Sequence, residues 1–266
     1  MSLVERYGPW AVIAGGSEGV GVSFARALAT EGVNLVLLAR KPGPLEDTAG
    51  AIRAEFGVEI RALSLDLTDP ETALTDLRIV TDPLEIGMLI YNAGTDNVAK
   101  NFVDRPYEAA RRNIGVNVIG QTLFAHHFGS AMRQRGRGGI ILVGSLLAYA
   151  GGGGMSIYAA AKSFSHTLAK GLWYEMRPYG VDVLSLVLSA TRTPAAERLG
   201  LRMDHPGLEA SDPDIVADEG LEQLGRVPLW VVRDAQSFAA HLKSLPEAEA
   251  LALVGSTAAA MHGGNV

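Results

Sequence analysis

The chain has 266 residues, of which 48% are hydrophobic and 20% charged, a composition typical of a globular protein with a large core rather than a disordered chain. Its 23 basic and 29 acidic residues give a net charge of −6, so it lacks the positive charge that neutralises phosphate backbones, and we expect no nucleic-acid partner. The absence of cysteine excludes disulfides, thiolate nucleophiles, iron–sulfur clusters and cysteine-ligated zinc, and is consistent with a reducing compartment.

The N-terminal residues carry charge before any long apolar run. Glu5 and Arg6 are followed by a turn at Gly8-Pro9, which differs from a secretory signal. We therefore expect a cytoplasmic protein.

Short apolar runs, rich in β-branched residues, alternate along the chain with stretches of helical spacing. The predicted strands are 10–14, 33–39, 58–65, 86–91, 139–143 and 181–188. The predicted helices between them are 20–30, 44–56, 70–80, 104–132 and 156–176. This alternation predicts βαβ units, and strands without polar alternation must be buried on both faces. We expect an α/β fold, a Rossmann-type doubly wound parallel sheet in three α/β/α layers, forming a single domain over residues 1–266.

Two segments need separate treatment. Residues 138–161 carry no charge and exceed the length of a membrane-spanning helix, but Gly151–Gly154 in their middle favours strand, loop and helix start, so we expect no membrane span. Residues 195–227 break the rhythm, and a segment covering the site and a plain surface loop are equally good interpretations. A seventh strand is predicted at 229–232 or 251–254.

The first predicted strand ends in a glycine-rich turn. Gly15, Gly19 and Gly21 flank Ser17, Glu18 and Val20 immediately before the first helix. Glycines let a backbone approach a ligand closely, and a helix N-terminus presents free N–H groups, so this turn predicts a diphosphate site. A tight strand-to-helix connection without a ligand remains the alternative.

The end of the second predicted strand bears on the cofactor. An acidic residue at this place in a dinucleotide fold bonds the ribose 2′-hydroxyl, whereas arginine accommodates a 2′-phosphate. This chain has Arg40-Lys41 there and no carboxylate before Glu46. We therefore expect NADP(H) to be preferred, with NAD(H) possible; a solvated strand end is the alternative interpretation.

A third pattern lies at the start of the predicted helix 156–176. Tyr158 and Lys162 are four residues apart, so both side chains emerge on one face, where an ammonium favours ionisation of the phenol. Ser145 follows the fifth predicted strand, at the carboxyl edge of the sheet where ligands bind. The pattern predicts a general acid/base.

Together these residues resemble the classical short-chain dehydrogenase/reductase family over roughly residues 8–194. Ala14 to Gly21 resembles its TGxxxGxG loop, with Ala14 in place of threonine, and Asn92-Ala93-Gly94 matches its NAG motif. A weaker similarity connects the chain with the branch containing 17β-hydroxysteroid dehydrogenases and 3-oxoacyl reductases.

The resemblance implies a role for each matching residue. Tyr158 would exchange a proton with the substrate oxygen, Ser145 would hydrogen-bond that oxygen, Lys162 would hold the nicotinamide ribose, and Asn117 would sustain a water relay. The catalytic set implied is Asn117, Ser145, Tyr158 and Lys162. The cofactor-binding set implied is Gly15, Ser17, Glu18, Gly19, Val20, Gly21, Arg40, Asp66, Leu67, Asn92, Ala93, Gly94, Tyr158, Lys162 and Thr193.

The chain departs from the family after the sixth predicted strand, where Leu188-Ser189 replaces Pro-Gly although Thr193 is retained. This replacement leaves the orientation of the nicotinamide in question. His126-His127 point about 100° apart on one helix, so we expect no metal site. The resemblance also implies a homodimer or homotetramer.

The function expected from these patterns is an NADP(H)-dependent oxidoreductase that interconverts a ketone and a secondary alcohol. The substrate would be a lipophilic small molecule, because apolar residues stand where a pocket is expected: Leu146, Leu147, Met155, Leu188, Leu199, Leu201 and Met203. The same residues would suit an ordinary core. A catalytically silent dinucleotide-binding sensor is the alternative function, although such a protein needs no proton donor.

Overall fold

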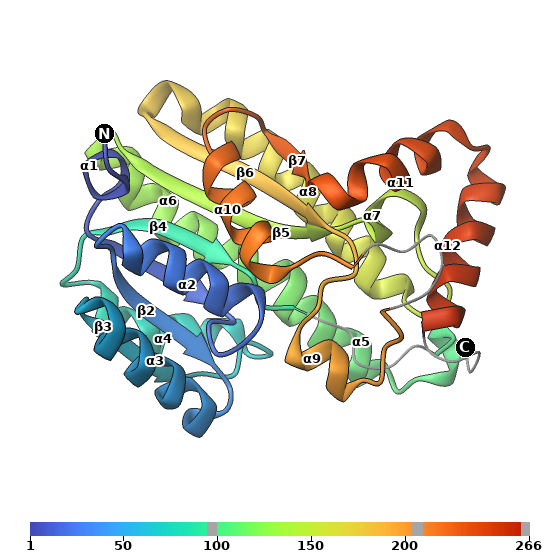
Figure 1. The fold of residues 1–266 in the computed structure, drawn as a ribbon, viewed down its shortest axis with the longest axis horizontal. Helices are drawn as coiled ribbons and strands as arrows, with labels where there is room; N and C mark the ends of the chain where they lie inside the picture. Colours follow the sequence, from blue (N-terminus) through green and yellow to red (C-terminus); the bar gives the residue numbers. More distant parts are fainter. Residues whose placement is uncertain (95–99, 204–209, 262–266) are drawn as a thin grey trace.

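A computed structural model describes residues 1–94, 100–203 and 210–261, and within them the strands form one parallel seven-stranded sheet (Figure 1). The strand order is β3-β2-β1-β4-β5-β6-β7. The strands are β1 (Trp10–Ala14), β2 (Asn34–Ala39), β3 (Ile60–Ser64), β4 (Ile86–Tyr91), β5 (Gly138–Ser145), β6 (Val181–Leu188) and β7 (Leu229–Val231).

The chain reverses its direction of travel across the sheet between β1 and β4. It builds β1, β2 and β3 toward one edge and then returns to place β4 on the other side of β1, with Ala14 paired to Tyr91. The carboxyl ends of β1 and β4 therefore diverge into loops that leave in opposite directions, which opens a crevice between them.

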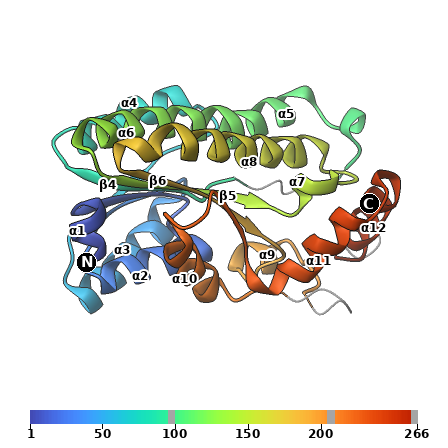
Figure 2. The ribbon, with the colours of Figure 1, turned by 90° about the horizontal axis from the view of Figure 1, so that it is seen from above.

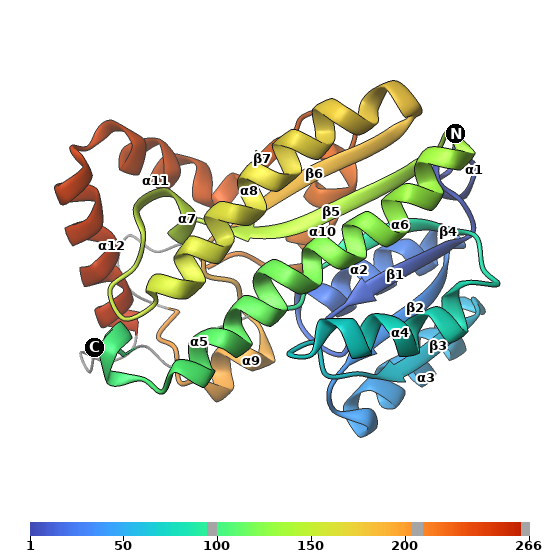
Figure 3. The same ribbon diagram turned by 180° about the vertical axis from the view of Figure 1, so that it is seen from behind.

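Helices cover both faces of the sheet, as Figure 2 shows edge-on. One face carries α4 (Pro70–Thr81), α6 (Gln121–Arg135) and α8 (Ser156–Met176), which Figure 3 shows in front of the strands. The other face carries α1 (Leu3–Tyr7), α2 (Val20–Thr30), α3 (Pro42–Phe56) and α10 (Pro213–Gln223). The residues of β1, β2 and β5 are buried in alternation against these two layers, which confirms the predicted α/β/α architecture.

The predicted helix 104–132 is interrupted. A 3₁₀ turn, η1 (Phe102–Asp104), precedes α5 (Tyr107–Ile114), and a π-helical turn, η2 (Gly115–Gly120), separates α5 from α6. Tyr91 explains part of this change, because its hydroxyl donates to the carbonyl of Val116 at 2.7 Å, and a Cβ on Gly120 would lie 2.3 Å from that hydroxyl. Periodicity within the helix carries no signal of this contact from β4.

The uncharged stretch 138–161 forms β5, the short α7 (Leu147–Ala150) and the start of α8. Across residues 1–94, 100–203 and 210–261, no helix combines the length and the hydropathy that crossing a membrane requires.

The C-terminal third differs in part from the prediction. The seventh strand forms at β7, whereas residues 251–254 lie in α12 (Glu247–Met261), which follows α11 (Arg233–Ser244). Within the predicted covering segment 195–227, α10 packs against α2, where a Cβ on Gly220 would lie 2.8 Å from Phe24 Cζ. Residues 204–209 of this segment, and residues 262–266, lie outside the described residues.

Candidate active site

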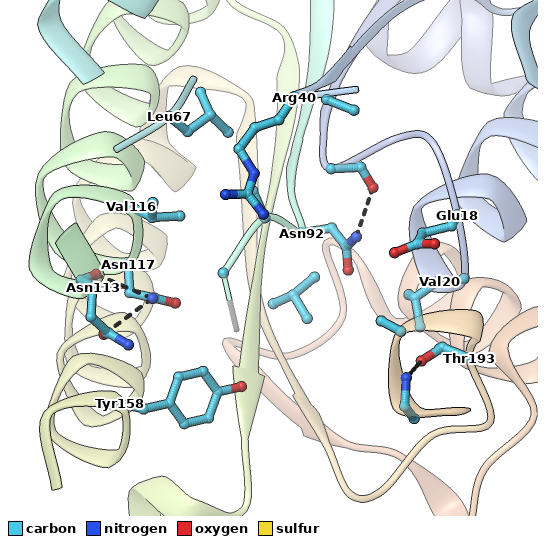
Figure 4. A pocket seen from close by; sticks show the side chains of 18 of the residues that line it. Glu18, Val20, Arg40, Leu67, Asn92, Asn113, Val116, Asn117, Tyr158 and Thr193 are labelled. Carbon is cyan, nitrogen blue, oxygen red and sulfur yellow. Dashed lines mark hydrogen bonds between the residues drawn. The ribbon is translucent and has the colours of Figure 1, made fainter. Parts of the chain in front are cut away.

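Loops from the carboxyl ends of six strands meet around one cavity of about 790 Å³. It extends from the β1–β4 crevice to the ends of β5 and β6, and Figure 4 shows its side chains converging from opposite walls. Of the predicted site residues, those that line the cavity are Gly15, Ser17, Glu18, Gly19, Val20, Arg40, Asp66, Leu67, Asn92, Ala93, Gly94, Asn117, Ser145, Tyr158, Lys162 and Thr193.

Gly21 is the exception, because it packs beneath the turn instead of facing the cavity. A Cβ at Gly21 would lie 1.9 Å from the carbonyl oxygen of Gly15. Its glycine therefore serves close packing of α2 against the end of β1.

The glycine turn is held open to a ligand by its backbone conformation. Gly15 and Gly19 have φ of +83° and +56°, values that side chains other than glycine rarely adopt. Gly19 is also the N-cap of α2 and has no side-chain cap, so the first N–H groups of the helix face the cavity with their partial positive charge. This arrangement suits an anion.

The neighbouring loop after β4 braces the glycine turn. The Asn92 side-chain amide donates to the carbonyl of Gly15 at 3.0 Å (Figure 4). Gly94, with φ of +130°, passes so close to Asn117 that a Cβ would lie 2.1 Å from Asn117 Oδ1. The Asn-Ala-Gly sequence thus joins the glycine turn to the opposite wall of the cavity.

Asn117 lies in the π-helical turn η2 and is 2% exposed. Its Nδ2 donates to the backbone carbonyl and to Oδ1 of Asn113, both at 3.2 Å (Figure 4). Its Oδ1 is buried without a hydrogen-bond partner in the structure. A buried amide oxygen left unpaired is costly, so this atom is a natural acceptor for a ligand or an ordered water.

Ser145, Tyr158 and Lys162 meet at the far end of β5. The Ser145 hydroxyl accepts from the backbone N–H of Leu147 at 3.3 Å, so its own proton can point elsewhere. The phenol of Tyr158 reaches into the cavity from α8 (Figure 4). Lys162 Nζ lies 5.4 Å from the centroid of the Tyr158 ring and donates to the carbonyl of Val143 at 2.8 Å. The three groups therefore border one space.

Burial changes the titration of Lys162. Only 3% of the residue is exposed, and the loss of hydration lowers the pKa of its ammonium to about 8. The side chain stays protonated at neutral pH, which keeps a positive charge beside the phenol of Tyr158.

The cavity is lined by both charged and apolar side chains. At the β2 and β3 ends, the guanidinium of Arg40 extends into the cavity beside Leu67 (Figure 4), and Asp66 also lines the cavity. At the β6 end, Leu188, Leu199 and Leu201 give an apolar lining. The cavity can therefore hold a charged group at one end and a hydrophobic group at the other.

The loop after β6, which lacks Pro-Gly, is held by backbone hydrogen bonds to a distant segment. Its backbone pairs with Ser211 through the N–H of Arg192 at 3.0 Å, and the Ser211 N–H donates to Ala190 at 2.9 Å. Thr193 caps α9 (Pro194–Arg198) by accepting from the N–H of Ala196 at 3.2 Å. The threonine hydroxyl thus remains at the cavity with a structural partner.

One face of α5 and the residues flanking that helix also line the cavity, which the sequence did not lead us to expect. The lining residues recur at helical spacing: Arg105 before α5, Ala109, Arg112 and Asn113 within it, and Val116 in η2. That spacing was a signal available in the sequence. Four residues expected in an apolar pocket do not line this cavity: Leu146, Leu147, Met155 and Met203. Leu146 belongs to the hydrophobic core.

Comparison with known proteins agrees with this geometry. The family described as short chain dehydrogenase matches residues 9–203, most of the chain. The chain belongs to the short-chain dehydrogenase family. It is accordingly an NAD(P)-dependent oxidoreductase acting on CH–OH and C=O groups.

Curated relatives come from two groups. A 7β-hydroxysteroid dehydrogenase of Clostridium sardiniense is 32% identical over 227 residues, which cover 85% of this chain and 86% of that protein. A very-long-chain 3-oxoacyl-CoA reductase of Aspergillus clavatus is 30% identical over 178 residues, which cover 66% of this chain and 52% of that protein. Hydroxysteroid dehydrogenases and 3-oxoacyl reductases are the relatives that the sequence resemblance indicated.

Solved structures give the same result. A 7β-hydroxysteroid dehydrogenase superposes with a TM-score of 0.88 at 28% identity, over 96% of this chain and 99% of that one. A short-chain dehydrogenase from Sphingobium yanoikuyae in complex with NADPH has a TM-score of 0.78 at 34% identity, over 91% and 93% of the two chains. The first match includes most of the C-terminal region beyond the family's matched segment.

Proposed function

We propose that this short-chain dehydrogenase is an NADP(H)-dependent enzyme that interconverts a ketone and a secondary alcohol on a lipophilic small molecule. The observation that carries the proposal is the convergence of Ser145, Tyr158 and Lys162 at one end of a cavity whose other end has Arg40. The family relationship supplies the reaction class, and the side chains supply the choice of cofactor and substrate.

The cavity fits a dinucleotide phosphate by its shape and donors. Gly15 and Gly19 carry no side chain, and the turn that contains them lies at the N-terminus of α2, which suits a diphosphate. Arg40 offers charge-assisted hydrogen bonds to a 2′-phosphate, and no carboxylate stands at the end of β2 to hold a ribose hydroxyl instead. The NADPH complex of the Sphingobium relative supports the same choice.

The bound nicotinamide supplies hydride transfer to or from the carbonyl carbon. Tyr158 would donate a proton to the carbonyl oxygen during reduction and accept it during oxidation. Ser145 would donate a hydrogen bond to that oxygen and so hold the carbonyl next to the phenol. Lys162, charged at neutral pH, would stabilise the phenolate left after proton transfer. The unpaired Oδ1 of Asn117 would accept from a water that returns a proton toward Lys162.

The substrate proposed is bulky and apolar. Leu188, Leu199 and Leu201 would contact it at the β6 end of the cavity. The relatives named 7β-hydroxysteroid dehydrogenase, and a structural relative from Comamonas testosteroni described as an alcohol dehydrogenase specific for bulky-bulky ketones, act on molecules of this kind.

Replacement of the phenol tests the catalytic part. Tyr158→Phe removes the proton donor without changing the ring, so we expect turnover of steroid, aromatic and acyl ketones to fall at least a thousandfold, about 4 kcal/mol of barrier. NADPH affinity, measured by fluorescence titration, should change less than twofold. A variant retaining most of the wild-type rate would contradict the role of Tyr158.

Replacement of the guanidinium tests the cofactor part. Arg40→Ala should weaken NADPH binding about tenfold or more, because a charge-assisted pair is lost, and should leave NADH binding nearly unchanged. The measurement is the ratio of the two dissociation constants. An unchanged ratio would remove the preference for NADP(H) from the proposal.

A further inference from the structure

The glycine turn contains a carboxylate at a place where the proposed cofactor brings phosphates. Glu18 lies between Ser17 and Gly19 and lines the cavity, and its carboxylate extends toward the same space as the guanidinium of Arg40 (Figure 4). A bare negative charge here would repel a diphosphate and a 2′-phosphate. The following inference rests on the proposed binding of NADP(H).

Arg198, on the neighbouring helix α9, neutralises this carboxylate. Its Nη1 donates to Glu18 Oε2 at 2.8 Å, and its Nη2 to Oε1 at 2.5 Å, a bidentate pair between segments 180 residues apart. The two side chains are partly exposed, 37% for Glu18 and 56% for Arg198. Exposed ion pairs contribute little to the stability of a fold, so stabilisation of the folded protein does not explain why Arg198 pairs with Glu18.

The placement of Arg198 depends on the loop after β6. Thr193 begins α9 and packs on the glycine turn, where a Cβ on Gly19 would lie 2.8 Å from Thr193 Cγ2. Arg198 is the last residue of this short helix. The helix therefore brings the guanidinium next to the turn that holds Glu18.

We propose that Arg198 is a positioning residue for cofactor binding: it holds the Glu18 carboxylate, and in doing so removes a negative charge that would repel the phosphates of NADP(H). Arg198 acts through Glu18 and not through a contact of its own with a phosphate. The effect is greater for NADPH than for NADH, because NADPH carries the additional phosphate. An unscreened unit charge at several ångströms from a phosphate changes binding by roughly three- to tenfold at low ionic strength.

The decisive experiment compares Arg198→Ala, Glu18→Gln and the double variant by fluorescence titration with NADPH and with NADH at low salt. We expect Arg198→Ala to weaken NADPH binding by roughly three- to tenfold, and NADH binding by less. Glu18→Gln in the same chain removes the repulsion, so the double variant should bind NADPH within twofold of the wild type.

Two results would overturn the proposal. If the double variant binds NADPH as weakly as Arg198→Ala, the guanidinium contacts the cofactor itself or merely holds α9 in place. If Arg198→Ala binds NADPH like the wild type, Glu18 exerts no repulsion. Thermal unfolding of each variant establishes that the comparison is made between folded proteins.

Matched variants separate this inference from the proposed function. Arg226→Ala removes another exposed arginine, which pairs with Glu222 at 2.9 Å and does not line the cavity. This variant should leave the affinities for NADPH and NADH unchanged. Arg40→Ala tests the preference for NADP(H) on its own. If Arg40→Ala lowers the NADPH affinity as expected but the Glu18 substitution restores nothing, the inference fails and the proposed function stands.

Discussion

His166 is a buried polar side chain directly behind the candidate catalytic residues. It lies four residues after Lys162 on α8, is 5% exposed, and its Nε2 has no hydrogen-bond partner in the structure. The ring occupies the space left by Gly144, where a Cβ would lie 2.5 Å from Nε2. Tyr149 packs on the ring at 5.5 Å, and Lys243 lies over Tyr149. The imidazole thus supports the end of β5 next to Ser145.

This burial predicts loss of stability in acid. Desolvation, with additional repulsion from Lys170, Lys162 and Lys243, lowers the pKa of His166 to about 4 from 6.5. As pH falls from 6.5 to 4, the unfolded chain takes up a proton that the folded protein does not, so the free energy of unfolding decreases. Between pH 7 and pH 5 the loss attributable to this group is roughly 2 kcal/mol.

Urea denaturation at pH 7 and at pH 5 measures this loss in the free energy of unfolding. His166→Gln should lower stability at pH 7, because it disturbs packing, but should remove most of the difference between pH 7 and pH 5. His126→Gln, on an exposed position of α6, should retain the full difference. Equal pH dependence in His166→Gln and the wild type would contradict the assignment.

At the scale of elements, α11 and α12 form a small cluster of their own against α7. Leu242, Ala250 and Val254 are its buried residues, and Leu147 and Ala150 of α7 pack on them. The N–H of Arg202 also donates to Met261 at 3.0 Å, which connects the end of α12 with the segment after α9. These C-terminal helices therefore pack against α7 (Figure 1) and contact the segment after α9, in which Leu199 and Leu201 line the cavity.

Loosening this cluster should affect substrate more than cofactor. Val254→Ala leaves a void beneath α7 and should reduce the free energy of unfolding by roughly 1–2 kcal/mol. We expect KM for a bulky ketone to rise about threefold or more and the Kd of NADPH to change less than twofold. Ser256→Ala, on an exposed position of α12, is the matched control. An equal loss of affinity for both ligands would show that α12 acts on the whole cavity.

At the scale of the molecule, the parallel sheet gathers loops that are distant in sequence. Arg40 follows β2, Asn92 follows β4, Ser145 ends β5 and Thr193 follows β6, yet all line one cavity. A ligand filling this cavity contacts both halves of the sheet on either side of the β1–β4 reversal. Its binding energy therefore adds to the stability of the whole fold.

Thermal unfolding tests this coupling. NADPH at 100 times its Kd contributes about 2.7 kcal/mol, which for a domain of this size raises Tm by about 5–10 °C. NADH at the same concentration should raise Tm less, and Arg40→Ala should lose most of the NADPH effect. Stabilisation by NADH as large as that by NADPH would contradict the proposed cofactor.

Three expectations about domain organisation and assembly stay predictions. These are the single domain over residues 1–266, the covering role of residues 195–227 and the homodimer or homotetramer. Among the described residues of that segment, the cavity is lined by Ala195, Ala196, Arg198, Leu199 and Leu201, while α10 packs in the layer that contains α2.

The sequence by itself determined the strands, most helices and the order of the site residues. Continuous apolar runs predict buried parallel strands, and a parallel sheet brings the residues after those strands to one edge. The glycine turn and the four-residue spacing of Tyr158 and Lys162 are local geometry, which a sequence pattern can express directly.

Only the tertiary structure decided the π-helical turn, the placement of α10 and the pairing of Glu18 with Arg198. The π-helical turn accepts a hydrogen bond from the hydroxyl of Tyr91 on β4. Helix α10 packs on Phe24 of α2, and Arg198 pairs with a carboxylate 180 residues away. Each depends on a contact between segments that are far apart in the chain, and periodicity within one segment carries no information about its partner.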